Sequence, residues 1–216
     1  MRSRKFASQL NRKPASRKPA KRIVIVCEGE KTETIYFGQF LDALRAANIQ
    51  LKVLGKECGS DPGSVVGYAD QIRNEDQGID ILYCVFDRDS HANFDQAVQS
   101  AEKIQIKIGN DRTFRSIKSY PCFEYWLLLH FSYSRKPYNG AGNHSSADLL
   151  IKELEKFIPN YKKSDEASIL GLADKTQTAI QNAKKSLDDA NKTGELNPST
   201  EVHEIVEAFL AFSQRI

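Results

Sequence analysis

The chain has 216 residues, of which 40% are apolar and 27% are charged, and its formal net charge is +3. This length suits one substantial core with an appendage and is short for two full domains. No apolar run approaches the roughly 20 residues that a membrane span needs, and no apolar signal segment lies near the start. We therefore expect a cytoplasmic protein without a membrane segment.

Positive charge is concentrated at the N-terminus. Residues 1–22 contain nine Lys or Arg and no acid, so the rest of the chain is net acidic. We expect residues 1–20 to form a disordered basic arm. Such an arm can bind nucleic acid, can act as a solvated tail that aids solubility, or can serve as an organellar transit peptide, and the composition leaves these alternatives open.

Strand and helix patterns alternate from residue 21 to residue 131. Segments 21–27 and 79–86 are continuously apolar, as strands buried on both faces of a parallel sheet are. Apolar residues at helical spacing follow each of them. We expect strands at 21–27, 50–54, 79–86 and 114–119, and helices at 34–47, 64–76, 94–108 and 123–131. The alternation predicts an α/β fold, a doubly wound parallel sheet flanked by helices.

The pattern changes after residue 131. A loop at 135–146 precedes three expected helices, at 146–157, 172–191 and 200–214, the last of which begins at the start signal NPST. We therefore expect three parts: the basic arm at 1–20, the α/β domain at 21–131, and a mostly helical extension at 132–216 that packs on the same core.

Two acidic clusters follow the two most apolar strands. Glu28 comes directly after the first, where Gly29 lets the backbone turn, and Asp87 and Asp89 come directly after the second. An extended backbone would place both carboxylates of this Asp-Arg-Asp segment on one side. Ligands bind at the carboxyl edge of such sheets, and closely spaced carboxylates favour Mg²⁺ or Mn²⁺. Each acid taken alone is also compatible with a solvated loop or helix cap.

Further candidates lie near these acids. Glu124 stands among apolar residues, where a carboxylate is costly unless it is paired or bound; it is a catalytic candidate or a buried acid that accepts backbone donors. Lys31 and Lys118 could contact phosphate, and each could equally be a surface lysine. Arg88 could bind phosphate or pair with an acid. His91 could reach substrate or metal, or lie on the surface.

Other patterns exclude alternative chemistries. The four cysteines are too widely spaced for a zinc knuckle, and two of them lie in apolar strands as expected of buried thiols in a reducing cytoplasm. His130 fits a core histidine, and Tyr125 and Trp126 fit core anchors. The segment GEKTE lacks the spacing of a Walker A motif, so any ATP hydrolysis would belong to a partner.

Several segments together resemble known families. IVIVCEGEKTE at 23–33 with CVFDRDSH at 84–91 resembles a toprim domain, the fold shared by topoisomerases, primases and overcoming-lysogenization-defect nucleases. The chain as a whole resembles the RloB-like family, which includes the AbiLii component of abortive-infection systems. The segments that carry this resemblance are CEGEKTE at 27–33, FDRD at 86–89, SYPCFEYWLLLHF at 119–131, and NPST with VHEIVE at 197–207.

The resemblance implies a metal set of Glu28, Asp87 and Asp89. It also implies a role in phage defence beside a partner ATPase of the ABC or AAA type, or beside restriction-system proteins. The turn EGEKTE departs from the usual toprim spacing, which leaves open whether Glu28, Glu30 or Glu33 faces the metal.

We therefore expect a Mg²⁺- or Mn²⁺-dependent nuclease that acts on DNA or RNA, tRNA included, as the effector of such a system. The alternative is a catalytically inactive binding or sensor subunit that regulates the partner ATPase. Phosphotransfer of the receiver-domain kind is disfavoured because the pattern lacks a single phosphoacceptor aspartate. The sequence leaves the oligomeric state open.

Overall fold

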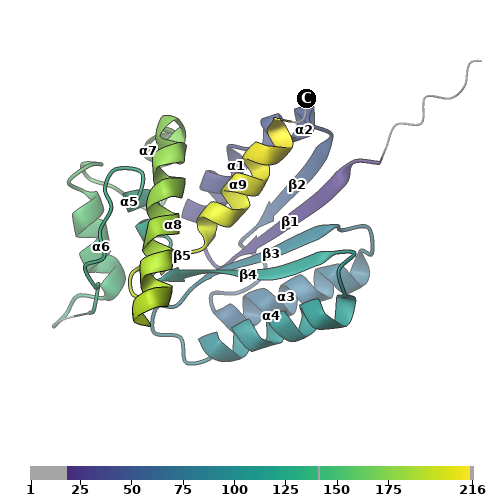
Figure 1. Cartoon of the computed structure of the whole chain (residues 1–216), viewed down its shortest axis with the longest axis horizontal. Coiled ribbons are helices and arrows are strands. Elements are labelled where there is room, and N and C mark those ends of the chain that lie inside the picture. The colour runs from purple at the N-terminus through teal and green to yellow at the C-terminus, as the bar shows by residue number, and fades with distance from the viewer. Residues whose placement is uncertain (1–18, 141, 215–216) are drawn as a thin grey trace, which may run out of the picture.

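A computed structural model of the chain describes residues 19–140 and 142–214. The expected basic arm lies almost entirely outside these residues. Five strands form one sheet in the order β2-β1-β3-β4-β5 (Figure 1). The first four strands are parallel and the fifth is antiparallel. The strands are β1 (Lys21–Cys27), β2 (Ile49–Leu54), β3 (Ile81–Asp87), β4 (Thr113–Tyr120) and β5 (Ser199–Thr200). The predicted α/β class is confirmed.

Helices cover both faces of this sheet, as Figure 1 shows. One face carries α3 (Pro62–Glu75) and α4 (Phe94–Ile108). The other face carries α1 (Thr32–Gly38), α2 (Leu41–Ala46), α5 (Glu124–Leu128) and the helices of the extension. The extension comprises α6 (Ser146–Leu154), α7 (Glu166–Leu170), the short 3₁₀ helix η1 (Ala173–Lys175), α8 (Thr176–Thr193) and α9 (Val202–Ser213). Among the described residues, no helix combines the length and apolarity required to cross a membrane.

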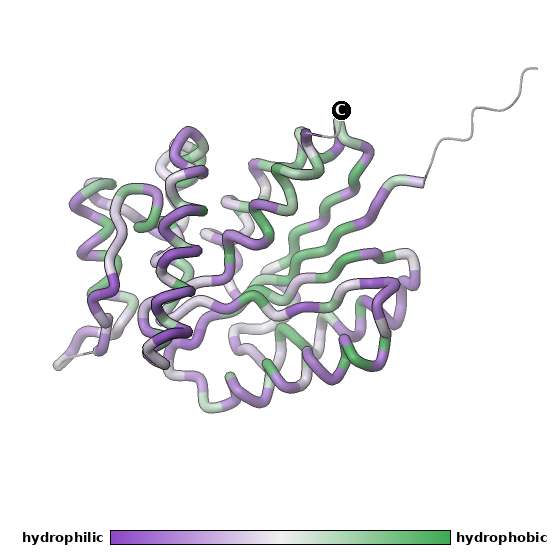
Figure 2. The backbone as a smooth tube through the Cα atoms, viewed as in Figure 1, coloured by the Kyte–Doolittle hydropathy of each residue, from purple (hydrophilic) through white to green (hydrophobic). Residues whose placement is uncertain are grey.

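The central strands are apolar on both faces because each face meets a separate core. In β1, Ile23 and Ile25 belong to the core on the α1 side, whereas Val24 and Val26 belong to the core under α3 and α4. The strands accordingly form the most continuously hydrophobic part of the chain in Figure 2. Buried residues of α6, α8 and α9 join the first of these cores, so the extension packs against the same sheet as α1 and α5.

The expected single helix at 34–47 is wrong. The chain forms two short helices there, because it turns at Gln39 and Phe40. Gln39 Nε2 donates to the carbonyl of Tyr36 at 2.7 Å, which satisfies the end of α1. The turn lets Phe40 pack with its ring centroid 5.4 Å from that of Phe209 in α9. Helical spacing continues across the break, so the sequence pattern did not reveal it.

The expected helix start at Thr200 is also wrong. Ser199 and Thr200 form β5 and pair with Tyr120 and Ser119 of β4, so α9 begins only at Val202. The Thr200 hydroxyl accepts from the Val202 backbone N–H at 3.2 Å, and it lies 3.0 Å from the Ser119 hydroxyl. A strand of two residues has no periodicity to detect, which explains the error.

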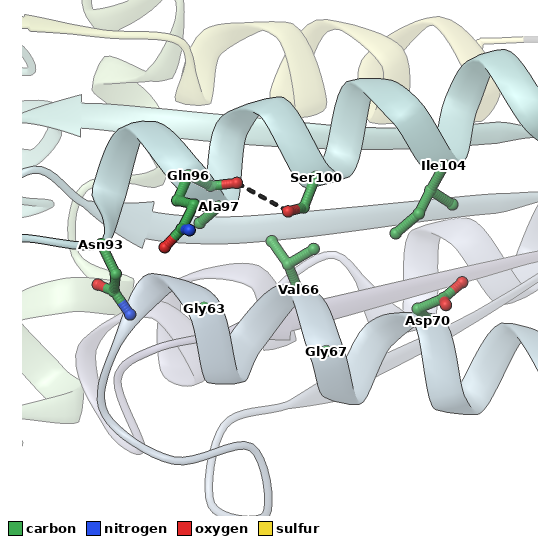
Figure 3. Close-up of a pocket in the computed structure, with 9 residues that line it drawn as sticks. All are labelled: Gly63, Val66, Gly67, Asp70, Asn93, Gln96, Ala97, Ser100 and Ile104. Carbon is green, nitrogen blue, oxygen red and sulfur yellow. Dashed lines mark hydrogen bonds between the residues drawn. The ribbon is translucent and has the colours of Figure 1, made fainter.

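A groove of about 260 Å³ runs between α3 and α4 (Figure 3). Small residues such as Gly63 and Gly67 open it, and the Ser100 hydroxyl on its wall donates to the Gln96 carbonyl at 2.8 Å. Its one acid, Asp70, is paired with Arg73 of the same helix. The acids singled out from the sequence do not line this groove; they lie at the carboxyl edge of the sheet.

Candidate metal centre

Glu28 lies where the carboxyl ends of β1 and β3 meet. Cys27 is in register with Val85, and the Glu28 backbone N–H donates to the Val85 carbonyl at 3.0 Å. The side chain then turns toward β3, where its Oε2 accepts from the Asp87 backbone N–H at 3.1 Å. The parallel register of the two strands therefore brings these two acids together, as the sequence predicted.

His91 binds the second oxygen of the same carboxylate. Its Nε2 lies 2.9 Å from Glu28 Oε1, and both side chains are mostly buried. Burial raises the pKa of Glu28, the Asp87 N–H and His91 lower it, and the nearby charge of Asp89 raises it again. His91 is thus part of the site, the less expected of the two roles open to it from the sequence.

Asp87 belongs to a compact group of metal-ligating side chains. One ligand atom each from Asp87, Cys122 and Glu124 lies within 4.8 Å of the others. Asp87 is the last residue of β3, Cys122 lies in the turn after β4, and Glu124 begins α5. The turn after β4 therefore carries a second acidic residue back over the end of β3.

Glu124 is almost fully buried, with an exposed fraction of 1%. Its Oε1 lies 3.2 Å from the ammonium of Lys163, a residue of the extension. Its Oε2 is buried and lacks a hydrogen-bond partner among the described residues. A buried carboxylate oxygen left unsatisfied is costly, so this atom is a candidate to bind a cation or to accept from the neighbouring Cys122 thiol.

Glu33 is the acid of the EGEKTE turn that reaches this group. It lies in the first turn of α1, it is buried, and its pKa is raised to about 7 by burial and by the charge of Glu124, with Glu28 adding to the effect. Glu30, by contrast, is exposed at the rim. Of the two rivals to Glu28 that the sequence left open, the structure places Glu33 beside it. We call Glu28, Glu33, Asp87 and Glu124 the carboxylate cluster.

Gly29 makes room for Glu33. A Cβ atom on Gly29 would lie 2.0 Å from Glu33 Oε2, far inside van der Waals contact. The carboxylate that Gly29 accommodates is therefore that of Glu33 and not that of the adjacent Glu28.

We expect Gly29→Ala to displace Glu33 because the flexible end of that side chain yields more readily than backbone does. Mn²⁺ affinity, measured by calorimetry, should fall about tenfold, the effect typical of a disturbed ligand shell. Gly38→Ala is the matched control, since a Cβ at Gly38 meets nothing within 4 Å. Equal Mn²⁺ affinity in both variants would contradict the role assigned to Gly29.

Burial and, after it, mutual repulsion disfavour the ionised forms of the carboxylate cluster. Burial raises the pKa of Asp87 well above its ordinary value, and the charges of Glu33, Glu124 and Glu28 raise it further. The Cys122 thiol is likewise held protonated, since burial and the charges of Glu124 and Asp87 raise its pKa. The available ligands are therefore oxygens, which suit a hard divalent cation better than a soft one.

Asp89 stands apart from this arrangement. The strand ends at Asp87, and Asp89 has a positive φ of 30°, with its N–H donating to the Pro121 carbonyl at 3.0 Å. The expected extended Asp-Arg-Asp geometry is therefore wrong, and Asp89 lies exposed at the rim. Arg88 Nη1 donates to the His91 carbonyl at 3.0 Å, and its guanidinium lies 5.2 Å from the Phe94 ring centroid, so it serves the turn.

A pocket of about 280 Å³ adjoins the cluster. Lys31 and Glu30 line it from the turn after β1, Glu33 lies on its wall, and Lys163 lines it from the extension. The lining therefore brings two lysines together with two acids, the exposed Glu30 and the buried Glu33. That combination suits an anionic ligand bound together with a cation.

Lys118 and His130 have other partners. The Lys118 ammonium lies 3.0 Å from Glu201, which also accepts from the Lys118 backbone N–H. His130 is buried, with Nδ1 3.0 Å from the Trp126 carbonyl and Nε2 3.3 Å from the Tyr36 hydroxyl. Burial lowers its pKa to about 4. The prediction of a core histidine is confirmed.

Two residues of this centre were not singled out from the sequence. Cys122 was considered only as one of four widely spaced cysteines, and Lys163 lies in a segment without a recognisable motif. Both reach the cluster through packing between distant segments, which local spacing does not encode. Glu33 had been only one of three alternatives.

The comparisons with known proteins place the chain in a family. Residues 23–209, most of the chain, match the model of the family described as RloB-like protein. Searches of curated proteins and of solved structures found no match. The matched range runs from within β1 to within α9 and includes every residue of the carboxylate cluster. The chain belongs to the RloB-like family.

Proposed function

We propose that the protein is a toprim-type, metal-dependent nuclease that hydrolyses phosphodiester bonds of DNA or RNA, tRNA included. In this proposal it acts in the bacterial cytoplasm as the effector of a phage-defence or abortive-infection system, beside a partner ATPase or restriction-system proteins. The observation that carries the proposal is the group of ligand atoms from Asp87, Cys122 and Glu124 at the carboxyl edge of the sheet, all within 4.8 Å of one another. Glu28 and Glu33 lie near enough for their charges to act on Asp87, and Glu124 Oε2 has no hydrogen-bond partner among the described residues.

A divalent cation fits this donor set. Burial, and after it the charges of neighbouring acids, raise the pKa values of Asp87 and Glu33, and a bound cation would favour the ionised form of both. Glu124 Oε2 has no hydrogen-bond partner among the described residues. Glu28, Asp87 and Glu124 would hold Mg²⁺ or Mn²⁺, with Glu33 beside them and Asp89 at the rim. When bound, such an ion lowers the pKa of a water molecule and neutralises charge on a phosphate.

The chain's own groups prepare this centre. The Asp87 N–H and His91 fix both oxygens of Glu28, so this carboxylate is oriented before any ligand arrives. His91 also places a group able to move a proton at the edge of the cluster. Lys31 and Lys163 put positive charge on the adjoining pocket, where a phosphate backbone can approach.

The test is cleavage by the purified protein, alone and with the ATPase encoded beside it. Single- and double-stranded DNA, mixed RNA and tRNA would each be incubated with Mn²⁺, with Mg²⁺ and with EDTA. We expect cleavage of at least one substrate with a divalent ion and none with EDTA. Glu124→Gln should abolish that cleavage and should also abolish toxicity when the pair is expressed in cells.

A protein that binds Mn²⁺ but cleaves nothing, with or without its partner, would refute the nuclease proposal and favour the regulatory subunit. Sequencing of cellular RNA and DNA ends after expression would detect a substrate missing from the purified set. Termini that are the same in cells expressing wild type and Glu124→Gln would lead to the same conclusion.

A further inference from the structure

Lys163 joins the helical extension to the carboxylate cluster. It follows the buried Tyr161, in the segment between α6 and α7. Its backbone carbonyl accepts a hydrogen bond from the Thr32 hydroxyl at the start of α1, at 2.7 Å. The segment is therefore fixed against the turn that carries Glu33, although 131 residues separate the bonded pair.

Among the described residues, the Lys163 side chain forms an ion pair with Glu124 and is otherwise open. Its ammonium lies 3.2 Å from Glu124 Oε1, yet 53% of the lysine side chain is exposed whereas the Glu124 side chain is 1% exposed. The same residue lines the pocket beside Lys31 and Glu33. An ammonium has three donor hydrogens, so donors remain for a ligand in that pocket.

One role of this contact is to satisfy an oxygen of the buried Glu124, because a buried carboxylate without a partner is costly. The lysine itself is half-exposed, so part of its charge still faces the pocket. A cation placed on a carboxylate of the cluster does have two other consequences. It opposes the binding of a second cation to the same carboxylate, and it holds a donor beside the place where a phosphate would lie.

We propose that Lys163 is a substrate-contacting residue of this centre, whose ammonium holds Glu124 in the ion-free protein and donates to a phosphate oxygen of nucleic acid in the adjoining pocket. The inference rests on the proposed function and deepens it, because it makes the extension part of the active site. Of the two lysines that line the pocket, the α/β domain supplies only Lys31, and the extension supplies Lys163.

The test compares Lys163→Met, Lys163→Arg and the matched control Lys162→Met, which removes the same charge from the exposed neighbouring residue. Three quantities are measured for each full-length protein: Mn²⁺ affinity by calorimetry without nucleic acid, affinity for a short oligonucleotide with Ca²⁺ in place of the catalytic ion, and the cleavage rate with Mn²⁺. Thermal melting checks that each variant is folded.

Lys163→Met should bind Mn²⁺ about 3- to 10-fold more tightly, because a competing positive charge is gone. The same variant should bind the oligonucleotide about tenfold more weakly and cleave it about 100-fold more slowly, the loss typical of one donor to a reacting group. Lys163→Arg should recover part of the oligonucleotide affinity and part of the cleavage rate. Lys162→Met should behave as wild type. A purely structural lysine would change metal and oligonucleotide binding in the same direction.

The inference is overturned if Lys163→Met binds the oligonucleotide and cleaves it as wild type does, or if it loses Mn²⁺ and oligonucleotide affinity together. The proposed function fails differently: the wild-type protein then cleaves no substrate. In that case the opposite shifts in the two affinities would still support Lys163 as a phosphate contact, and their absence would refute it.

Discussion

Asp87→Asn is expected to abolish metal-dependent cleavage while making the metal-free protein at least as stable as wild type. The substitution keeps the size and one acceptor oxygen of the side chain but removes its negative charge. In the wild type that charge lies at a partly buried position close to Glu33, Glu124 and Glu28, and desolvation and these three charges all disfavour it. Loss of a metal ligand therefore lowers the cleavage rate, whereas loss of a repulsive charge raises the free energy of unfolding of the metal-free protein.

The expected sizes are large enough to measure. Cleavage should fall by at least about 100-fold and Mn²⁺ affinity by at least about tenfold, the losses that follow disturbance of a metal's ligand shell. The Tm in EDTA at pH 8 should rise by about 2–4 °C, or ~1 kcal/mol for a chain of this size. In wild type alone, saturating Mn²⁺ at about 100 times its Kd should add about 2.7 kcal/mol to the free energy of unfolding.

Asp111→Asn is the matched control, because it makes the same chemical change at an exposed acid outside the cluster. It should leave cleavage, Mn²⁺ affinity and Tm unchanged. A lower Tm in EDTA for Asp87→Asn would mean that Asp87 stabilises the fold through its charge, and the description of the cluster as electrostatically repulsive would then be wrong.

The acids at strand ends could be read from the sequence because their position depends on the sheet alone. Segments 21–27 and 79–86 are apolar on both faces, so they had to be central strands, and the residue after each had to lie at the carboxyl edge. Glu28 and Asp87 follow from that argument, and the structure places them together. Asp89 does not follow, because its position depends on where the strand stops.

The remaining residues of the centre depend on contacts between distant segments. Glu33 reaches the cluster from the first turn of α1, and Lys163 because Thr32 binds the extension. The break between α1 and α2 and the two-residue β5 have the same kind of cause, since Phe40 meets Phe209 and Thr200 meets Ser119. Periodicity reports which face of a segment is buried, but it does not report which distant segment buries it.

Glu33 provides the second large prediction, a dependence of stability on pH that reverses when metal is added. Its pKa is about 7 in the folded protein, against an ordinary value of 4.5. Between these two values the folded state keeps a proton that the unfolded state has released. Metal-free stability therefore falls as the pH rises through this window, by up to ~3 kcal/mol from this group.

Buried His130 acts in the opposite direction. Its pKa of about 4 lies below its ordinary value of 6.5, so its neutral folded form gains stability as the pH rises between these values. The useful quantity is therefore the difference between Glu33→Gln and wild type, in which the contribution of His130 cancels. In EDTA, Glu33→Gln should gain stability relative to wild type progressively from about pH 4.5 to about pH 7.

Urea denaturation at several pH values, with EDTA and with Mn²⁺, measures both halves of this prediction. Because Mn²⁺ binds ionised carboxylates, its stabilisation of wild type should grow across the same pH window in which the metal-free protein weakens. The growth should be smaller in Glu33→Gln. In EDTA, the difference in free energy of unfolding between the two proteins could instead be independent of pH. Glu33 would then be ionised in the folded protein throughout this range, and its raised pKa would be wrong.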